Sequence, residues 1–314
     1  MCRNMTLISD HPLTLRTTPW RDYALVDSGG GRKLERYGDY LVIRPEPQCW
    51  WSPKYPALWD TADAVFDAEN EDEDGGRWAF RRRPDEQWAL GYDRVKFYGR
   101  FTSFRHLAFF PEQAANWAWQ KAALEKRADQ PRVLNLFGYT GVASLVCAAA
   151  GARVTHVDAS KKSVTYAREN ATLSGMEDAP IRWIVEDARK YVQREVKRGS
   201  KYEGIILDPP KYGRGPTGEV WRLFEDLPEM LGLCAQLLSD DAAFFLLNAY
   251  AARVSGPALA HLMAESIGQR PGRIDYGELT LIEDGKTPKG AKAVDIAPRE
   301  IGLSFFARWM KEPV

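Results

Sequence analysis

Acidic side chains follow several short apolar segments in the second half of the chain. Asp158 ends the segment HVD, 20 residues after Gly138, and an acidic side chain at this position can accept hydrogen bonds from both hydroxyls of an adenosine ribose. Asp187 closes the next apolar segment, immediately before a helical pattern that opens at Ala188. Capping a helix is the alternative role for both aspartates, and Ser160 is a second candidate for the cap after Asp158.

The sequence LNLFGYTG, residues 134–141, runs from an apolar segment into a turn with two glycines, Gly138 and Gly141. Glycine allows the backbone to approach a ligand that a side chain would exclude. An ordinary tight turn between a strand and a helix explains this segment equally well on its own. Taken with Asp158 and Asp187, which follow it in order, the turn favours a ligand that contains adenosine.

The segment IILDPPKYGRG, residues 205–215, places an acid and two prolines directly after an apolar strand pattern. Consecutive prolines fix φ and lack N–H donors, so this loop is expected to be stiff, with carbonyl oxygens available as acceptors. Asp208 is expected beside the reacting centre of a bound donor, and Tyr212 is expected to stack on a flat acceptor. A strand terminator would account for Pro209 and Pro210 but not for the residues around them.

Alternating strand and helix patterns position these motifs from residue 111 onward. The expected strands are 132–137, 153–157, 181–185, 204–207 and 243–247, with two more near 274–281 and 303–309. The expected helices are 114–124, 142–150, 162–173, 188–197, 220–238 and 257–267. This alternation predicts a doubly wound α/β domain with a mostly parallel sheet, whose ligands bind at the carboxyl ends of the strands. Each of the motifs lies at such an end.

The first part of the chain has the pattern of short strands, and we expect a small β-rich module over residues 1–110 and a catalytic domain over 111–314. Residues 77–105 carry eight basic residues against three acidic ones, together with eight aromatics. Arginines for phosphates and aromatics for bases are typical of a single-stranded RNA site, but an antiparallel sheet with aromatics on one face is an alternative. The candidate RNA surface comprises some of Arg81, Arg82, Arg83, Arg94 and Lys96.

The overall composition limits the class of protein. The 314 residues contain 43 Lys and Arg against 43 Asp and Glu, which excludes a protein that is basic throughout. No secretory signal is readable, and the apolar runs are shorter than the roughly 20 residues that span a bilayer, so a cytoplasmic protein is expected. The four cysteines lie far apart, without the spacing of metal ligands, so we predict neither a disulfide framework nor a metal site.

The motifs together resemble those of class I S-adenosylmethionine-dependent methyltransferases. The resemblance rests on residues 135–141, on Asp158 and Asp187, on DPPKY, and on the segment ENATLSG at 169–175. It is strongest to the bacterial 23S ribosomal RNA large-subunit base methyltransferases and covers roughly residues 105–310. It implies a Rossmann-like sheet of seven strands behind a small β-rich module, and methyl transfer from S-adenosylmethionine to a base in RNA. The RNA-binding PUA domain that this group often carries is not recognisable here.

The resemblance also implies which residues form the site. The acceptor side would comprise Asp208, Pro209, Pro210, Tyr212 and Asn248. The cofactor would be held by Gln113, Asn135, Phe137, Gly138, Tyr139, Thr140, Gly141, Asp158, Ala159, Ser160, Asn170, Asp187, Ala188 and Asp208.

One departure from the family bears on the chemistry. Members that methylate cytosine at C5 carry a nucleophilic cysteine after the fifth strand, where this chain has LLNAYAA at 246–252. Cys147 and Cys234 lie within apolar helical patterns and are expected to be core residues. Methylation at a nitrogen needs only positioning and polar acceptors, so we expect it rather than the C5 reaction.

Two other functions stay open at this stage. One is a methyltransferase for a small molecule or a protein, with the first module as a lid or an oligomer contact. The other, less favoured, is a nucleotide-binding protein or an NAD-dependent dehydrogenase, although G-x-x-G replaces the G-x-G-x-x-G of the dinucleotide fold. An RNA partner and no membrane partner are expected, and a homo-oligomer is left open.

Overall fold

The computed structural model describes residues 6–68, 75–82, 85–102, 104–250, 254–289 and 292–311. The chain forms two compact units. Unit 1 comprises Met1–Leu15, Ala115–Leu279 and Leu303–Val314, and unit 2 comprises Arg16–Ala114 and Thr280–Gly302.

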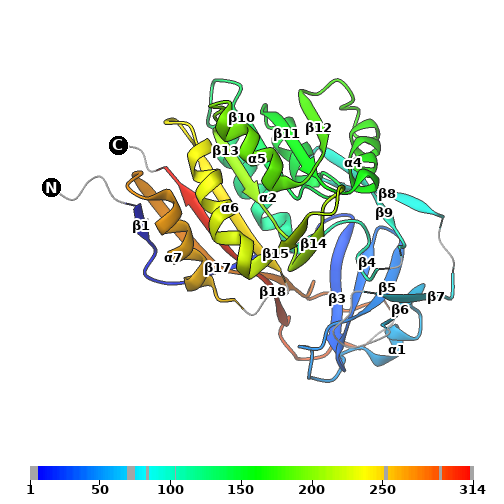
Figure 1. The fold of residues 1–314 in the computed structure, drawn as a ribbon. Helices are drawn as coiled ribbons and strands as arrows, with labels where there is room; N and C mark the ends of the chain where they lie inside the picture. The colour runs from blue at the N-terminus through cyan, green and yellow to red at the C-terminus, as the bar shows by residue number, and fades with distance from the viewer. Residues whose placement is uncertain are drawn as a thin grey trace. The chain divides into compact units, whose positions relative to one another are not determined.

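Unit 1 is built on a largely parallel sheet (Figure 1). The strands follow the order β1-β17-β18-β16-β13-β10-β11-β12, and β2 also pairs with β17, which gives nine strands in the described part of the chain. The strands from β16 to β12 are paired in parallel, and β18 pairs antiparallel to β16. Their bounds are β1 Thr6–Ile8, β2 Leu13–Thr17, β10 Arg132–Leu136, β11 Arg153–Asp158, β12 Ile181–Val185, β13 Gly204–Leu207, β16 Phe244–Tyr250, β17 Gly272–Ile282 and β18 Glu300–Met310. The expected seven-stranded α/β sheet is confirmed as the run from β12 to β17, and β1 and β2 extend it.

Helices bury both faces of this sheet, which is why its central strands read as continuous apolar runs. Residues from α5, α6 and α7 form one core with the strands, and α2 and α3 contribute to the core of the other face (Figure 1). The helices are α2 Ala114–Glu125, α3 Val142–Ala149, α4 Lys161–Leu173, α5 Ala188–Lys197, α6 Leu223–Leu237 and α7 Gly256–Ile267. No helix in the described ranges is long and apolar enough to cross a membrane.

The expected helix over 220–238 begins later than predicted. Residues Val220–Arg222 form strand β15, which pairs antiparallel with β14, Tyr212–Arg214, and α6 starts only at Leu223. The indole Nε1 of Trp221 donates to the carbonyl of Pro210 at 2.8 Å, and this contact holds the segment as a hairpin. The three residues 220–222 are too few to show a period, and they fit the first turn of a helix as well as a short strand. The sequence pattern alone therefore could not distinguish a helix from a strand here.

Unit 2 contains the β-rich module. Its five-stranded sheet has the order β3-β4-β5-β6-β7, and β8 and β9 form a separate antiparallel pair. The elements are β3 Tyr23–Gly29, β4 Arg32–Tyr37, β5 Tyr40–Pro45, α1 Pro56–Trp59, β6 Ala64–Ala68, β7 Gly76–Phe80, β8 Gln87–Tyr92, β9 Val95–Arg100 and the 3₁₀ helix η1 Pro111–Gln113.

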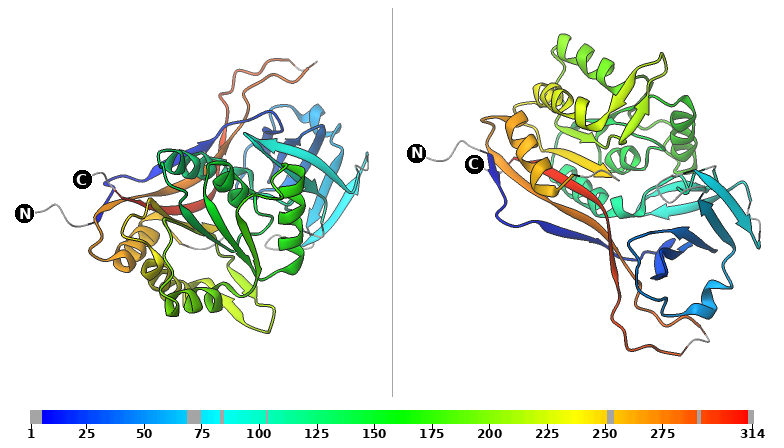
Figure 2. Two further views of the ribbon diagram at one scale, coloured as in Figure 1. Left: turned by 90° about the horizontal axis from the view of Figure 1, so that it is seen from above. Right: turned by 60° about the horizontal axis from the view of Figure 1, so that its bottom comes forward.

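The two units do not coincide with the expected division between residues 110 and 111. The first fifteen residues belong to unit 1, where β1 pairs with β17, and residues 280–302 belong to unit 2. The reason is the length of β17 and β18, which run side by side as strands of 11 residues each and pass through both units (Figure 2). Because this division depends on pairing between strands far apart in the chain, the local amino-acid composition does not change where one unit ends and the other begins.

A buried ion pair lies inside unit 2. The guanidinium of Arg44 contacts the carboxylate of Glu35 at 2.7 Å, and both Tyr23 and Tyr37 donate hydroxyl hydrogen bonds to the same carboxylate. Burial alone would raise the pKa of Glu35, but Arg44 and Lys33 hold this pKa at about 2. The Glu35 carboxylate therefore stays ionised, with the Arg44 guanidinium as its partner.

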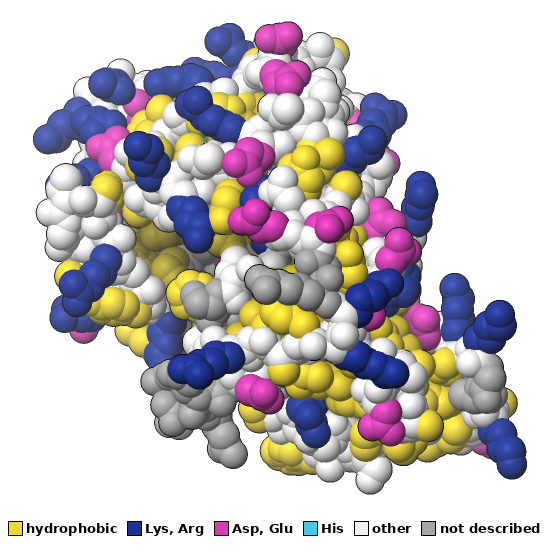
Figure 3. Space-filling model, turned by 90° about the vertical axis from the view of Figure 1, so that its right-hand side faces the viewer, with side chains coloured by type: hydrophobic (Ala, Val, Ile, Leu, Met, Phe, Trp, Pro, Cys, Tyr) yellow, Lys and Arg dark blue, Asp and Glu magenta, His cyan; other side chains and the backbone are white. Residues whose placement is uncertain are grey.

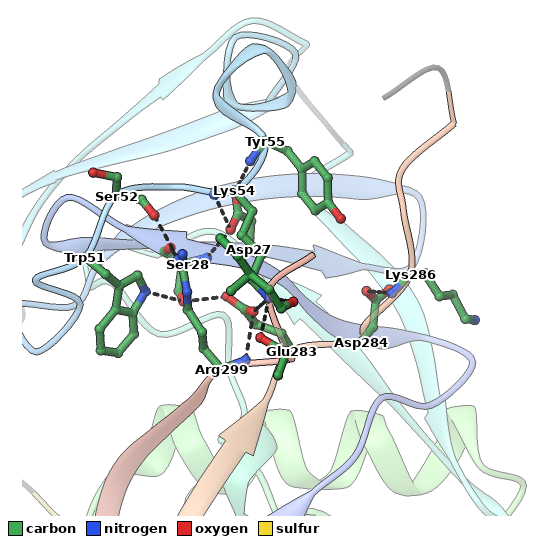
Figure 4. A network of polar contacts seen from close by, with 12 residues as sticks. Asp27, Ser28, Trp51, Ser52, Lys54, Tyr55, Glu283, Asp284, Lys286 and Arg299 are labelled. Carbon is green, nitrogen blue, oxygen red and sulfur yellow. Dashed lines mark hydrogen bonds and ion pairs between the residues drawn. The ribbon is translucent and has the colours of Figure 1, made fainter. Parts of the chain in front are cut away.

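A second polar network ties Glu283 and Arg299 to β3 and to Lys54 (Figure 4). The Glu283 carboxylate pairs with Lys54 at 2.7 Å and accepts hydrogen bonds from Ser28 Oγ and from the backbone N–H of Arg299. The carboxylate of Asp27, which is fully buried, accepts the backbone N–H groups of Ser28 and Lys54. These contacts hold together segments more than 220 residues apart in sequence.

We predict that Glu283→Ala destabilises unit 2 strongly. Both side chains of its ion pair with Lys54 are at most 5% exposed, so the change leaves a buried ammonium without its counter-ion. Breaking such a pair costs about 3–5 kcal/mol. Urea unfolding, followed by tryptophan fluorescence, measures the loss.

The matched control is Glu125→Ala, which removes a half-exposed carboxylate 3.8 Å from Lys121. This change should cost only about 0.5 kcal/mol. Equal effects of the two substitutions would mean that the Glu283 network does not stabilise the fold.

Candidate active site

The predicted motifs converge on one edge of the sheet in unit 1. Strands β10, β11, β12 and β13 are paired in parallel, so the segments that follow them emerge at the same edge. This edge carries the turn at 137–141, Asp158, Asp187 and Asp208, and Asn248 lies near the same end of β16.

The turn after β10 has an unusual backbone. Phe137 and Tyr139 have φ angles of 57° and 49°, in the left-handed region that residues with side chains rarely adopt. Gly141 has φ of 82° and precedes the first residue of α3. Strained backbone of this kind persists only where surrounding contacts fix it, and it concentrates at binding sites.

Gly138 lies directly against a buried histidine. A Cβ atom at Gly138 would be 2.4 Å from Cε1 of His156, a distance at which the backbone or the ring would have to move. The ring is held by Ser144, whose Oγ lies 3.0 Å from Nδ1 and accepts a hydrogen bond from the Asn135 amide at 2.8 Å. Burial lowers the pKa of His156 to about 3, so the ring is neutral and serves as a packing surface. Asn135, predicted as a cofactor residue, thus supports the turn indirectly, through Ser144 and the His156 ring.

Asp158 connects the turn to the end of β11. Its Oδ2 accepts the backbone N–H of Tyr139 at 2.9 Å, and its Oδ1 accepts the N–H of Ser160 at 2.8 Å. Burial raises the pKa of Asp158, and these two hydrogen bonds oppose the rise. A carboxylate oxygen can accept two hydrogen bonds, so each oxygen retains capacity for one hydroxyl of a ribose.

The hydroxyl of Ser160 caps α4 by accepting the N–H of Ser163 at 3.2 Å, so Asp158 is not the cap of this helix. Ala159 lies between the two. Farther along α4, the buried Asn170 amide donates to the carbonyl oxygen of Thr140 at 2.9 Å. Asn170 therefore fixes the second half of the turn through its backbone.

Asp187 caps α5, which begins at Ala188. Its Oδ1 accepts the N–H of Lys190 at 2.9 Å, which is the capping role weighed from the sequence. The cap places the free backbone N–H groups at the start of α5 at the same edge of the sheet as Asp158.

Asp208 follows β13 and contacts a buried amide. Nδ2 of Asn248 donates to Asp208 Oδ1 at 2.8 Å, and Oδ1 of Asn248 accepts from Ser304 Oγ at 3.3 Å. Ser304 fixes the orientation of the amide, because a flipped amide would present its oxygen to the carboxylate. Burial raises the pKa of Asp208 to about 6, and the Asn248 hydrogen bond partly opposes this. Asp208 therefore changes protonation just below neutral pH.

The loop after Asp208 is anchored by an aromatic residue. Trp221 is buried, its ring centroid is 5.0 Å from that of Phe137, and its Nε1 donates to the carbonyl of Pro210. One of the two proline carbonyls expected to be available is thus occupied. Tyr212 is half-exposed on the hairpin that follows.

Three functional candidates were not found from the sequence. Ser304 lies 56 residues from Asn248 and meets it only through the pairing of β18 with β16. Trp221 was not recognised because it lies in the segment 220–238, whose pattern predicts a helix. His156 lies in β11, and its contact with Gly138 depends on the pairing of β10 with β11.

The remaining candidates lie in unit 2 or outside the described residues. Gln113 is buried in η1 of unit 2, and its contact with a cofactor stays a prediction. Arg82 pairs with Asp63 at 2.9 Å, Arg81 donates to the carbonyl of Asp60, and Arg83 lies outside the described residues.

One face of the molecule is mixed in charge. Figure 3 shows Lys and Arg side chains mingled with acidic and hydrophobic ones over the face that it draws. In the stretch 77–105, aromatic rings pack on one another, as Phe101 does against Trp78 at 4.7 Å. These contacts favour the sheet interpretation for most aromatics of this stretch.

The described cysteines are all buried. Cys147 and Cys234 are fully buried in α3 and α6, and burial raises the pKa of Cys147 to about 12 and raises that of Cys234 as well. Cys49 belongs to unit 2, and Cys2 lies outside the described residues. A thiol with such a pKa is not a nucleophile at neutral pH.

Comparison with known proteins identifies the family. The model of the S-adenosylmethionine-dependent methyltransferases matches residues 75–261, more than half of the chain. A crystal structure of a SAM-dependent methyltransferase from Agrobacterium tumefaciens is 45% identical, covers 99% of this chain and 97% of its own, and has a TM-score of 0.92.

Two curated relatives are ribosomal RNA methyltransferases. Ribosomal RNA large subunit methyltransferase K/L of Shewanella frigidimarina is 36% identical over 39% of this chain and 17% of its own length. Ribosomal RNA large subunit methyltransferase I of Aeromonas salmonicida is 27% identical over 60% of this chain and 44% of its own. The chain thus spans less than half the length of either. Because the family model matches more than half of the chain and the 45% identical crystal structure covers nearly all of it, the chain belongs to the S-adenosylmethionine-dependent methyltransferases, and S-adenosylmethionine is its methyl donor.

Proposed function

We propose that this enzyme methylates a base in RNA, with ribosomal RNA as the favoured substrate, at a nitrogen rather than at cytosine C5. The observation that carries the chemical part is the Asp208–Asn248 pair, a hydrogen-bonded acceptor at the end of β13. The described cysteines of unit 1 are buried in helices and cannot supply the thiolate that a C5 reaction needs. The RNA part is supported by what the curated relatives are named for.

The proposed cofactor site is the edge described above. The backbone of the 137–141 turn would contact the methionine and adenosine portions, and it can lie in this position because Gly138 has no side chain to collide with His156. Asp158 would accept both ribose hydroxyls, and Asp187 with Ala188 would contact the adenine edge. Asn135, Asn170, Thr140 and Ser160 would act through the turn and the α4 cap that they hold.

The proposed chemistry is a direct displacement. The bound sulfonium supplies an electrophilic methyl group, and the lone pair of the acceptor nitrogen attacks it as the carbon–sulfur bond breaks. The Asp208 carboxylate accepts an N–H hydrogen bond from the base, which orients the lone pair, and it can take the proton that the nitrogen loses after methylation. Pro209 and Pro210 keep the loop after Asp208 stiff. A ribosomal substrate would agree with the cytoplasmic location expected from the sequence.

The test of the proposal is transfer of a labelled methyl group from S-adenosylmethionine to ribosomal RNA lacking its natural methylations. We expect label in the RNA fraction, and digestion to nucleosides should yield a base methylated at nitrogen. Substrate RNA that contains 5-fluorocytidine should form no adduct that survives denaturation, because trapping requires a covalent bond from cysteine to C6. Label in the protein or small-molecule fraction would replace the RNA proposal, and an adduct lost in a cysteine variant would replace nitrogen by C5.

We predict that Asp158→Ala weakens binding of S-adenosylhomocysteine. Hydrogen bonds to a charged acceptor contribute about 1.5–3 kcal/mol, which corresponds to one to two decades of affinity. Isothermal titration measures the dissociation constant, and Glu177→Ala, an exposed acid on the loop after α4, is the control. Unchanged affinity in folded Asp158→Ala would remove this carboxylate from the site.

We predict that turnover rises with pH through about 6. Asp208 is protonated below its pKa of about 6 and ionised above it, so the active carboxylate is lost as the pH falls. Asn248→Ala removes the hydrogen bond that lowers this pKa, and should move the midpoint of the kcat profile to higher pH. Ser304→Ala should move it in the same direction, because the Asn248 amide is then free to rotate.

The control for Ser304→Ala is Ser266→Ala, which removes a hydroxyl that donates to Leu262 in α7. Its profile should match that of the unmodified enzyme. A profile that is flat between roughly pH 5 and 7 would contradict the role given to Asp208.

A further inference from the structure

The hairpin that follows the Asp-Pro-Pro loop has two unlike faces. Strands β14 and β15 pair Tyr212 with Arg222, Gly213 with Trp221 and Arg214 with Val220. Residues directly opposite in an antiparallel pair point to the same side, so the first and third pairs share one face.

The inner face is closed. Trp221 is 5% exposed, packs on Phe137 and donates to the carbonyl of Pro210. The outer face is open, because Tyr212 is 51% exposed and Arg214 and Arg222 are also exposed. The hairpin therefore presents one aromatic ring and two guanidinium groups to solvent, immediately beside the acceptor loop.

Contacts from α5 and α6 make this hairpin a rigid platform. Lys190 pairs with Glu219 at the hairpin tip, and this hydrogen bond, the largest effect, lowers the pKa of Glu219 to about 2. Asp226 accepts the N–H of Arg222 at 2.7 Å and pairs with Arg189 at 2.8 Å. The acid at the tip is thus already paired, which leaves the positive charges of the outer face less compensated.

The cations of the outer face differ in their partners. Arg222 has an exposed ion pair with Glu225 at 3.1 Å. Arg214 has its Nε 3.3 Å from the Tyr212 hydroxyl, and among the described residues no acid lies within ion-pair distance of Arg214. Arg222 lies opposite Tyr212 in the hairpin, and Phe224 at the start of α6 adds an aromatic side chain that is 60% exposed.

We propose that the outer face of the β14–β15 hairpin binds the single-stranded RNA that flanks the target base. Tyr212 stacks on a base, and Arg214 and Arg222 contact the phosphates beside it. An exposed aromatic ring between cations is the composition by which proteins hold single-stranded nucleic acid, since the ring takes the base and the cations take the backbone. The surface begins at Tyr212, four residues after Asp208, so a strand held there delivers its neighbouring base to the acceptor side. This inference rests on the proposed function and names the surface that serves it.

The experiment measures binding of a short fluorescein-labelled single-stranded RNA of mixed sequence by anisotropy, over a series of salt concentrations. Arg214→Gln should reduce the slope of log affinity against log salt by about 0.7, the value for one phosphate contact in a single strand. Tyr212→Leu should weaken binding roughly 5- to 100-fold, whereas Tyr212→Phe, which keeps the ring, should retain most of the affinity. Arg182→Gln, an exposed arginine in β12 of the same unit, is the matched control and should leave both quantities unchanged.

Each outcome decides between the two proposals. RNA binding that Arg214→Gln and Tyr212→Leu leave intact, with methyl transfer to RNA preserved, would overturn the hairpin surface and leave the RNA function standing. Failure of the unmodified enzyme to bind this RNA at low salt, together with label transferred to protein, would overturn the RNA function and the surface with it. Binding of S-adenosylhomocysteine by every variant shows that each is folded.

Discussion

The close contact between the backbone of Gly138 and the ring of His156 is the constraint on which the site depends. Because glycine has no Cβ, the chain leaving β10 can press against a side chain of β11, where any other residue would meet the ring at 2.4 Å. The N–H of Tyr139 can then reach the Asp158 carboxylate at 2.9 Å. The neutral, buried ring acts as a spacer, and the Asn135–Ser144 pair keeps it in place.

The other half of the site is governed by burial of an acid. Asp208 lies where burial raises its pKa to about 6, and a single amide, oriented by Ser304, keeps it from rising further. A carboxylate poised near neutral pH accepts hydrogen bonds more strongly than one with an ordinary pKa, and it can still release the proton it takes up. The anchored hairpin begins four residues later, at Tyr212, so a base held over Asp208 and the RNA strand attached to it would contact adjacent segments of the chain.

Much of this arrangement follows from local sequence. The alternation of strand and helix patterns was sufficient to predict the parallel sheet. The acids at the ends of the apolar runs could then be placed at one edge, because ligand sites in such sheets lie at the carboxyl ends of strands. Asp158 and Asp208 were therefore placed correctly at the ends of β11 and β13. The contact of Ser304 with Asn248 and the extent of unit 2 could not be predicted from the sequence, because both depend on the pairing of strands far apart in the chain. Trp221 was misassigned to a helix, since its hairpin is stabilised by a tertiary contact with Pro210 rather than by its own pattern.

The proposed cofactor site is tested most directly by a crystal structure of the protein with S-adenosylhomocysteine. We predict that both ribose hydroxyls donate to Asp158, that the backbone of the 137–141 turn lies along the ligand, and that the ligand sulfur faces Asp208. A ligand bound elsewhere, or one whose ribose contacts neither oxygen of Asp158, would contradict this prediction.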